Sequence, residues 1–169
     1  MSIAIEPCKS NNLLDFFETE LDYHQQLILL VFSKQHRIIG KTRLQKLIFL
    51  MDNEILGKPI FQYEPYKFGP YSAKLIAAMD ELMELGLIKE KFNEYREPEI
   101  YVTEYEISAI GLEKANQMIH KINPIKLEKI EEMVHEHGYQ EIDSILHHVY
   151  VNYPTFTENS IIKDEVFNY

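Results

Sequence analysis

The sequence holds a single cysteine, Cys8, among its 169 residues. One cysteine cannot close a disulfide within the chain, and it cannot build a thiolate metal site, which needs several cysteines at short spacing. Sparse cysteine is also typical of proteins that work in a reducing compartment. We therefore expect a cytoplasmic protein that owes none of its stability to disulfides.

A long hydrophobic run is absent as well. The longest run, Leu27 to Phe32, has six residues, whereas a helix that crosses a bilayer needs about 20. The first twelve residues, MSIAIEPCKSNN, lack the basic stretch followed by an apolar core that is typical of a secretory signal. The sequence predicts no association with a membrane.

Catalytic and cofactor-binding motifs are missing too. Ser72 follows Gly69-Pro70-Tyr71 and does not stand in the Gly-x-Ser-x-Gly turn of hydrolases. Residues 40–42 read Gly-Lys-Thr but lack the upstream glycine of a phosphate-binding loop. The sequence therefore predicts no catalytic residue and no cofactor, and a protein that is not an enzyme.

Four histidines could suggest a metal site in two C-terminal helices: His135, His137, His147 and His148. The first pair diverges by roughly 200° on a helix and the second by roughly 100°. At most one histidine from each pair can meet, and no cysteine or suitably spaced acid completes a ligand set. We expect no metal.

Positive charge is scarce over the whole chain but concentrated in one segment. The formal net charge is −10, which disfavours indiscriminate binding to nucleic acid. Residues 34–74, however, carry eight Lys/Arg and three Asp/Glu, a local excess of five positive charges. A contact with an acidic partner surface, or with DNA, would therefore be expected in this segment.

Hydrophobic periodicity predicts a mainly helical chain with one hairpin. We expect helices over 24–34, 42–55, 72–85, 108–119, 124–138 and 141–151, and a short helix from about Ser160. Thr42, Ser72 and Asn123 are the predicted N-caps. Gly57-Lys58-Pro59 is the predicted stop of the second helix, and 37–40 is a predicted break. Residues 87–92 and 100–107 are predicted strands joined by a charged tip. Residues 61–68 alternate aromatics and are predicted to be extended until Gly69-Pro70 breaks the chain.

This order, three helices followed by a hairpin, predicts an α+β, mainly helical fold with a winged-helix-like core. In such a fold the second and third helices form a helix-turn-helix, and the hairpin is the wing. We expect a loosely ordered leader over residues 1–22, the winged-helix-like domain over 23–122, and additional C-terminal helices over 123–169 packed on it.

Three segments resemble a known group of proteins. They are IIGKTRLQKLIFL (38–50), FQYEPYKFGPYSAKL (61–75) and LMELGLI (82–88). They are similar to the YwgA-like proteins of bacteria and archaea and, more distantly, to the Panacea domain of SocA-like antitoxins. Residues 147–160, HHVYVNYPTFTENS, resemble the C-terminal end of that group. The resemblance implies a winged-helix-like core and, through the SocA-like branch, a protein that neutralises a partner toxin or acts as an adaptor.

Two functions follow as hypotheses. The first is protein interaction, in which an aromatic edge docks on a partner and basic residues pair with its acidic groups. The second is a DNA-binding regulator that acts as a homodimer, although the solvent face predicted for the third helix is acidic (Lys74, Ala77, Glu81 and Glu84). For either function the candidate contact residues are Lys41, Arg43, Lys46, Tyr66, Lys67, Tyr71, Ser72 and Lys74.

Overall fold

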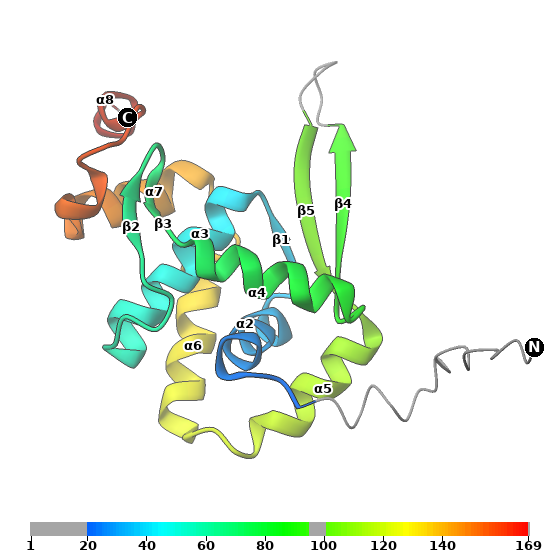
Figure 1. Cartoon of the computed structure of the whole chain (residues 1–169). Helices are drawn as coiled ribbons and strands as arrows, with labels where there is room; N and C mark the ends of the chain where they lie inside the picture. The colour runs from blue at the N-terminus through cyan, green and yellow to red at the C-terminus, as the bar shows by residue number, and fades with distance from the viewer. Residues whose placement is uncertain (1–19, 95–100, 169) are drawn as a thin grey trace, which may run out of the picture.

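The computed structural model describes residues 20–94 and 101–168 (Figure 1). For residues 93, 94 and 101 it describes the backbone only. The helices are α2 (Tyr23–Lys34), α3 (Lys41–Leu50), α4 (Ala73–Glu84), α5 (Ala109–Ile119), α6 (Pro124–His137), α7 (Ile142–Asn152) and α8 (Lys163–Phe167). The α+β, mainly helical class is confirmed. The predicted tip of the hairpin, and the predicted leader as far as residue 19, lie outside the described residues.

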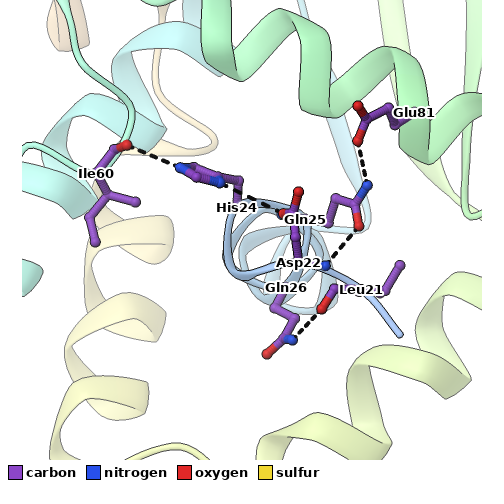
Figure 2. Close-up of polar contacts among 7 residues, drawn as sticks. All are labelled: Leu21, Asp22, His24, Gln25, Gln26, Ile60 and Glu81. Atoms are coloured by element: carbon purple, nitrogen blue, oxygen red, sulfur yellow. Dashed lines mark hydrogen bonds and ion pairs between the residues drawn. The ribbon is translucent and has the colours of Figure 1, made fainter. Parts of the chain in front are cut away.

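Helix α2 is the centre of the molecule, with α4, α5 and α6 around it (Figure 1). All six residues of the apolar run 27–32 are buried, as expected of a helix that is covered on every side. Asp22 and Gln25 form a capping box at its start. Figure 2 shows Gln25 reaching from α2 to Glu81 on α4, where its side-chain nitrogen donates to the carboxylate at 2.6 Å.

A three-stranded antiparallel sheet has the order β1-β5-β4. Its strands are β1 (Arg37–Ile39), β4 (Ile88–Glu94) and β5 (Tyr101–Ile107). The predicted hairpin is confirmed. The predicted break at 37–40 is wrong, because Ile38 pairs with Tyr105 and is fully buried. Strand β1 has three residues and one buried side chain, so it is too short to show the alternation of apolar and polar residues that predicts a strand. Its pairing partner, β5, lies over sixty residues away.

Helix α3 is capped two residues earlier than predicted. Its N-cap is Gly40, with φ 91° and no side-chain cap bond, so the prediction of Thr42 as the cap is wrong. The helix continues as a π-helix, η1 (Met51–Leu56). That element ends at Gly57 in the left-handed region, and the predicted stop at Gly57 is confirmed.

The aromatic segment forms a hairpin of its own. Strands β2 (Glu64–Tyr66) and β3 (Gly69–Tyr71) pair antiparallel, with Pro65 opposite Pro70. The predicted extended segment 61–68 is confirmed only over Glu64–Tyr66, since Lys67 and Phe68 form the turn. The predicted break at Gly69-Pro70 is wrong, since both residues belong to β3. Proline is tolerated because each strand of this two-stranded sheet is an edge strand.

The helices after residue 123 share the core. Asn123 caps α6, as predicted, by accepting from the backbone N–H of Ile125. Helix α6 contacts α2, and α7 contacts α3 and β3. Ile130, Val134, Val149 and Tyr150 are buried in the same hydrophobic cluster as α2 and α3. The short 3-10 helix η2 (Pro154–Thr157) leads to α8, which begins slightly after the expected Ser160. In the described residues, no helix is long and apolar enough to cross a membrane.

Candidate interaction site

Ser72 joins the β2–β3 hairpin to α4. Its hydroxyl donates to the carbonyl of Phe61 and accepts from the N–H of Leu75 at 2.9 Å. The side-chain amide of Gln45 accepts from the N–H of Ser72 at 2.9 Å and donates to its carbonyl at 3.1 Å. The predicted capping role is confirmed. Ser72 is fully buried, so its hydroxyl faces the protein interior and not a partner.

Lys46 also points inward, with only 2% of its surface exposed. Its Nζ donates to the carbonyl oxygen of Pro70 at 2.9 Å. Burial lowers the pKa of Lys46 to about 7, and among the described residues no neighbouring carboxylate counteracts that effect. As a predicted contact residue Lys46 is expected on the surface, but the β2–β3 hairpin covers it.

A pocket of about 270 Å³ lies between this hairpin and the first turns of α3. We call it the hairpin pocket. Among the residues that line it are Lys41, Lys46, Tyr66, Phe68, Tyr71 and Ile76. The rings of Tyr66 and Tyr71 lie 5.0 Å apart, while Tyr66 and Phe68 remain 45% and 43% exposed. Four of the eight predicted contact residues, Lys41, Lys46, Tyr66 and Tyr71, therefore meet in one place.

The other exposed candidates are Lys67 and Lys74. The Nζ of Lys67 lies 6.0 Å from the centre of the Tyr66 ring, at the outer range of a cation–π contact. The backbone carbonyl of Lys67 accepts from the N–H of Ile161 at 2.9 Å, which fixes the hairpin tip to the C-terminal segment. Lys74 is exposed in the first turn of α4.

Arg43 faces a second cavity, which we call the basic groove. This groove has a volume of about 750 Å³, and its lining includes Lys34, Arg37, Lys41 and Arg43 together with one acid, Glu141. Half of the Lys/Arg side chains in the basic segment 34–74 thus gather here. Lys41 lines both cavities and joins the basic groove to the hairpin pocket.

Most cations of the basic groove already have partners. Lys34 pairs with Glu131 at 3.0 Å, and Arg37 with Glu104 at 3.6 Å. Arg43 donates to the carbonyl oxygens of His137 and Gly138 at 3.2 and 3.4 Å, at the end of α6. Burial lowers the pKa of Arg43, and the nearby Glu141 acts against that shift. Arg43 therefore holds α6 against α3 as well as facing the groove.

The exposed face of α4 is acidic, as the sequence suggests. Its solvent-facing side chains are Lys74, Ala77, Asp80, Glu81 and Glu84. Phosphates of DNA would meet three or more carboxylates along this helix, so it is poorly suited to lie in a major groove.

One histidine from each predicted pair does meet the other. The rings of His137 and His148 lie 4.7 Å apart, and His148 Nε2 lies 2.9 Å from a carboxylate oxygen of Glu54. Burial lowers the pKa of His137. Across the described residues, no group of three or more His, Cys, Asp or Glu is arranged to hold a metal ion.

Two important residues of this region are not among the contact residues predicted from the sequence. Phe68 is as exposed as Tyr66 and lines the hairpin pocket, and Gln45 holds both backbone groups of Ser72. Phe68 belongs to the aromatic segment that the sequence marks, but it lies in the turn between β2 and β3 and not on a strand face. No local signal marks Gln45, because its partner lies 27 positions later.

Comparison with known proteins gives a relation and no function. No family model matches the chain. The chain is similar to the Uncharacterized protein YwgA of Bacillus subtilis (strain 168), with 34% identity over 64 residues. These residues are 37% of this chain and 37% of YwgA, so the match spans well under half of either protein. The match supports a YwgA-like relation and gives no support for a relation to the SocA-like antitoxins.

Proposed function

We propose that this protein is a non-enzymatic protein-interaction module of the antitoxin or adaptor kind. The observation that carries the proposal is the β2–β3 hairpin, which presents two half-exposed aromatic rings, Tyr66 and Phe68, over the hairpin pocket. Aromatic side chains are enriched among the residues that dominate binding energy at protein interfaces, especially where they flank a pocket. Lys41 and Lys67 surround them with positive charge suited to an acidic partner.

We further propose that the core is a winged helix. Helices α2, α3 and α4 precede the β4–β5 hairpin, and β1 adds to the outer side of β5. In this arrangement α3 and α4 are the helix-turn-helix, and the β2–β3 hairpin is an insertion between them. The insertion lies over α3 and ends at the cap of α4, so it occupies a place from which it can present aromatic side chains without disturbing the three helices.

The mechanism is occlusion. The partner lays an apolar segment over the hairpin, and the lysines pair with acidic groups around it. Burying two large aromatic rings that are now half exposed is worth on the order of 1 kcal/mol each from area alone. The interaction needs no reaction chemistry, and its effect on the partner is to cover the partner's own functional surface.

Partner capture from the native host tests this proposal. Tagged wild-type protein is compared with a Tyr66→Ser, Phe68→Ser double variant, with nuclease in every sample. The matched control is Phe92→Ser, which removes a ring that is 68% exposed. Phe92 lies on β4, in the β4–β5 hairpin and not in the β2–β3 hairpin. We expect a stoichiometric partner with wild type and with Phe92→Ser, and its loss from the double variant. Equal capture by all three proteins would refute the role of the hairpin.

DNA binding is the second candidate, favoured by the four cations of the basic groove. Binding to duplex DNA would weaken steeply with salt, because each phosphate contact releases counterions. An Arg37→Ala, Lys41→Ala variant should then lose affinity, while Lys126→Ala on the exposed side of α6 should not. A homodimer, measured by light scattering, would double the basic surface. Absence of a shift with genomic fragments at low salt excludes this candidate.

A further inference from the structure

The buried ammonium of Lys46 has unused hydrogen-bonding capacity. A lysine ammonium offers three donors, and the carbonyl of Pro70 takes one of them. Within the described residues, no other hydrogen bond or ion pair of Lys46 is present. A buried charge without a counter-ion is unfavourable, so a ligand that brings an acceptor of opposite charge would be strongly favoured at this point.

The hairpin pocket supplies the space for such a ligand. Lys46 and its acceptor Pro70 both line it, and none of the described residues that line it is acidic. The remaining wall is largely apolar, formed by the side chains of Tyr66, Phe68, Tyr71 and Ile76. Its volume of about 270 Å³ is small beside the roughly 300–1,000 Å³ of pockets for drug-sized ligands. It suits a single residue of a polypeptide.

One group must therefore carry both a carboxylate for Lys46 and an apolar side chain for the aromatic wall. Internal Asp or Glu offers the carboxylate without the apolar part, and internal Phe or Leu offers the reverse. In a polypeptide, only the C-terminal residue bears a carboxylate and an apolar side chain on the same carbon atom. Capture of a C-terminal carboxylate is also a recurrent way to recognise a peptide.

We propose that the hairpin pocket binds the C-terminal hydrophobic residue of the partner protein, with its carboxylate on the Nζ of Lys46 and its side chain against Tyr66, Phe68 and Tyr71. This inference rests on the proposed function, since it identifies the part of the partner that the interaction module recognises. Lys41, which is exposed and lines the same pocket, adds a second positive charge near the bound carboxylate.

The arrangement has a consequence for pH. Lys46 must be protonated to hold a carboxylate, and its pKa in the empty pocket is about 7. Binding therefore takes up a proton when the pH is above that value. The affinity should fall by about tenfold for each pH unit above 7, until the pKa of Lys46 in the complex is reached.

The test uses a single-residue probe and the full chain. N-acetyl-L-phenylalanine, which has a free carboxylate, is titrated into isotope-labelled protein, and amide resonances are followed by NMR. N-acetyl-L-phenylalaninamide is the neutral control, and N-acetylglycine is the control without an apolar side chain. We expect the acid to shift resonances of residues 66–72 and to bind at least tenfold more tightly than either control. Equal binding of acid and amide, shifts elsewhere, or no shifts would overturn the inference.

Two variants assign the effect to Lys46. Lys46→Met removes the ammonium, keeps an unbranched apolar side chain of similar length, and should abolish both the preference for the acid and the pH dependence. Lys126→Met, which removes an exposed lysine of α6 that does not line the pocket, should change neither. If Lys46→Met does not fold, the comparison of acid with amide on the wild-type protein still decides the matter.

The outcomes for this site and for the proposed function can be told apart. Capture that depends on the hairpin, without any preference of the pocket for the acid, would overturn this inference and leave the proposed function standing. Selective binding of the acid without partner capture would support the pocket and count against the proposed function. Loss of capture when the C-terminal residue of the captured partner is amidated would support both.

Discussion

At the scale of single residues, Lys46 has the largest expected effect on stability. Its pKa is about 7 in the folded protein and about 10.5 in an unfolded chain. Between these values the unfolded chain holds a proton that the folded protein has released. The free energy of unfolding therefore rises with pH over this range, by at most about 1.4 kcal/mol per pH unit. Urea denaturation at pH 7, 8 and 9 measures this slope.

Comparison with Lys46→Met isolates the lysine. The variant should be more stable than wild type at pH 7, because a buried charge is replaced by an apolar group of similar length, and the difference should shrink toward pH 9. The range from pH 7 to 9 lies between the shifted pKa values of two other buried groups. The pKa of Asp52 is about 6, and burial raises the pKa of Tyr63 well above 10. A constant difference across the window would show that Lys46 is not the group responsible.

At the scale of elements, the fit between β3 and α7 depends on Gly69. Gly69 has φ +83°, and a Cβ there would lie 3.0 Å from Cε2 of Tyr150 and 3.4 Å from Cε of Lys46. Gly69→Ala should destabilise the protein by about 2 kcal/mol or more, from strain in the left-handed region together with this close approach. Thermal unfolding followed by circular dichroism measures the effect.

Gly57→Ala is the matched control for this prediction. Gly57 also lies in the left-handed region, with φ +62°, but a Cβ there meets no atom of the described part of the chain within 4 Å. It therefore reports the cost of backbone strain alone, which is about 1 kcal/mol. If the two substitutions cost the same, β3 is free to move away from Tyr150, and the close packing of the hairpin on α7 is not a constraint.

The elements whose signals are local could be predicted from the sequence. Ser72, Gly57 and Asn123-Pro124 mark helix ends through neighbouring backbone groups, and all three predictions are confirmed. Strand β1 could not be predicted, because its reason for being a strand is the distant β5. Structure that depends on pairing partners far along the chain leaves little trace in a short segment.

The candidate site shows the same limit. Periodicity puts Leu44, Leu47 and Ile48 on the inner face of α3, and Lys46 then falls on the outer face. In the structure every residue from Leu44 to Leu50 is buried, since the β2–β3 hairpin and α7 enclose this helix. The aromatic cluster was predictable as a group of residues. The pocket it forms with Lys46 was not, because a helix face indicates direction and does not show what covers it.

At the scale of the whole molecule, the division at residue 122 can be tested by its energetics. The helices after it contribute Ile130, Val134, Ile145, Val149 and Tyr150 to the single hydrophobic cluster. Burial of each such side chain is worth about 2 kcal/mol. Their sum, roughly 10 kcal/mol, is comparable to the total stability of a typical domain, about 5–15 kcal/mol. We therefore expect a fragment of residues 1–122 to lack a cooperative unfolding transition by circular dichroism, although it contains all the elements of the proposed winged helix.

Two substitutions on α7 test, in the full-length chain, whether the C-terminal helices and the rest of the core unfold as one unit. Val149 is fully buried and Val151 is 52% exposed, and both lie in α7. Val149→Ala should lower the free energy of unfolding by about 2 kcal/mol, whereas Val151→Ala should change it by less than about 0.5 kcal/mol. If the C-terminal helices belong to the same cooperative unit, Val149→Ala will also increase hydrogen exchange in α2 and β5. Increased exchange confined to α6, α7 and α8 would show instead that residues 23–122 fold independently and that the C-terminal helices are an appendage.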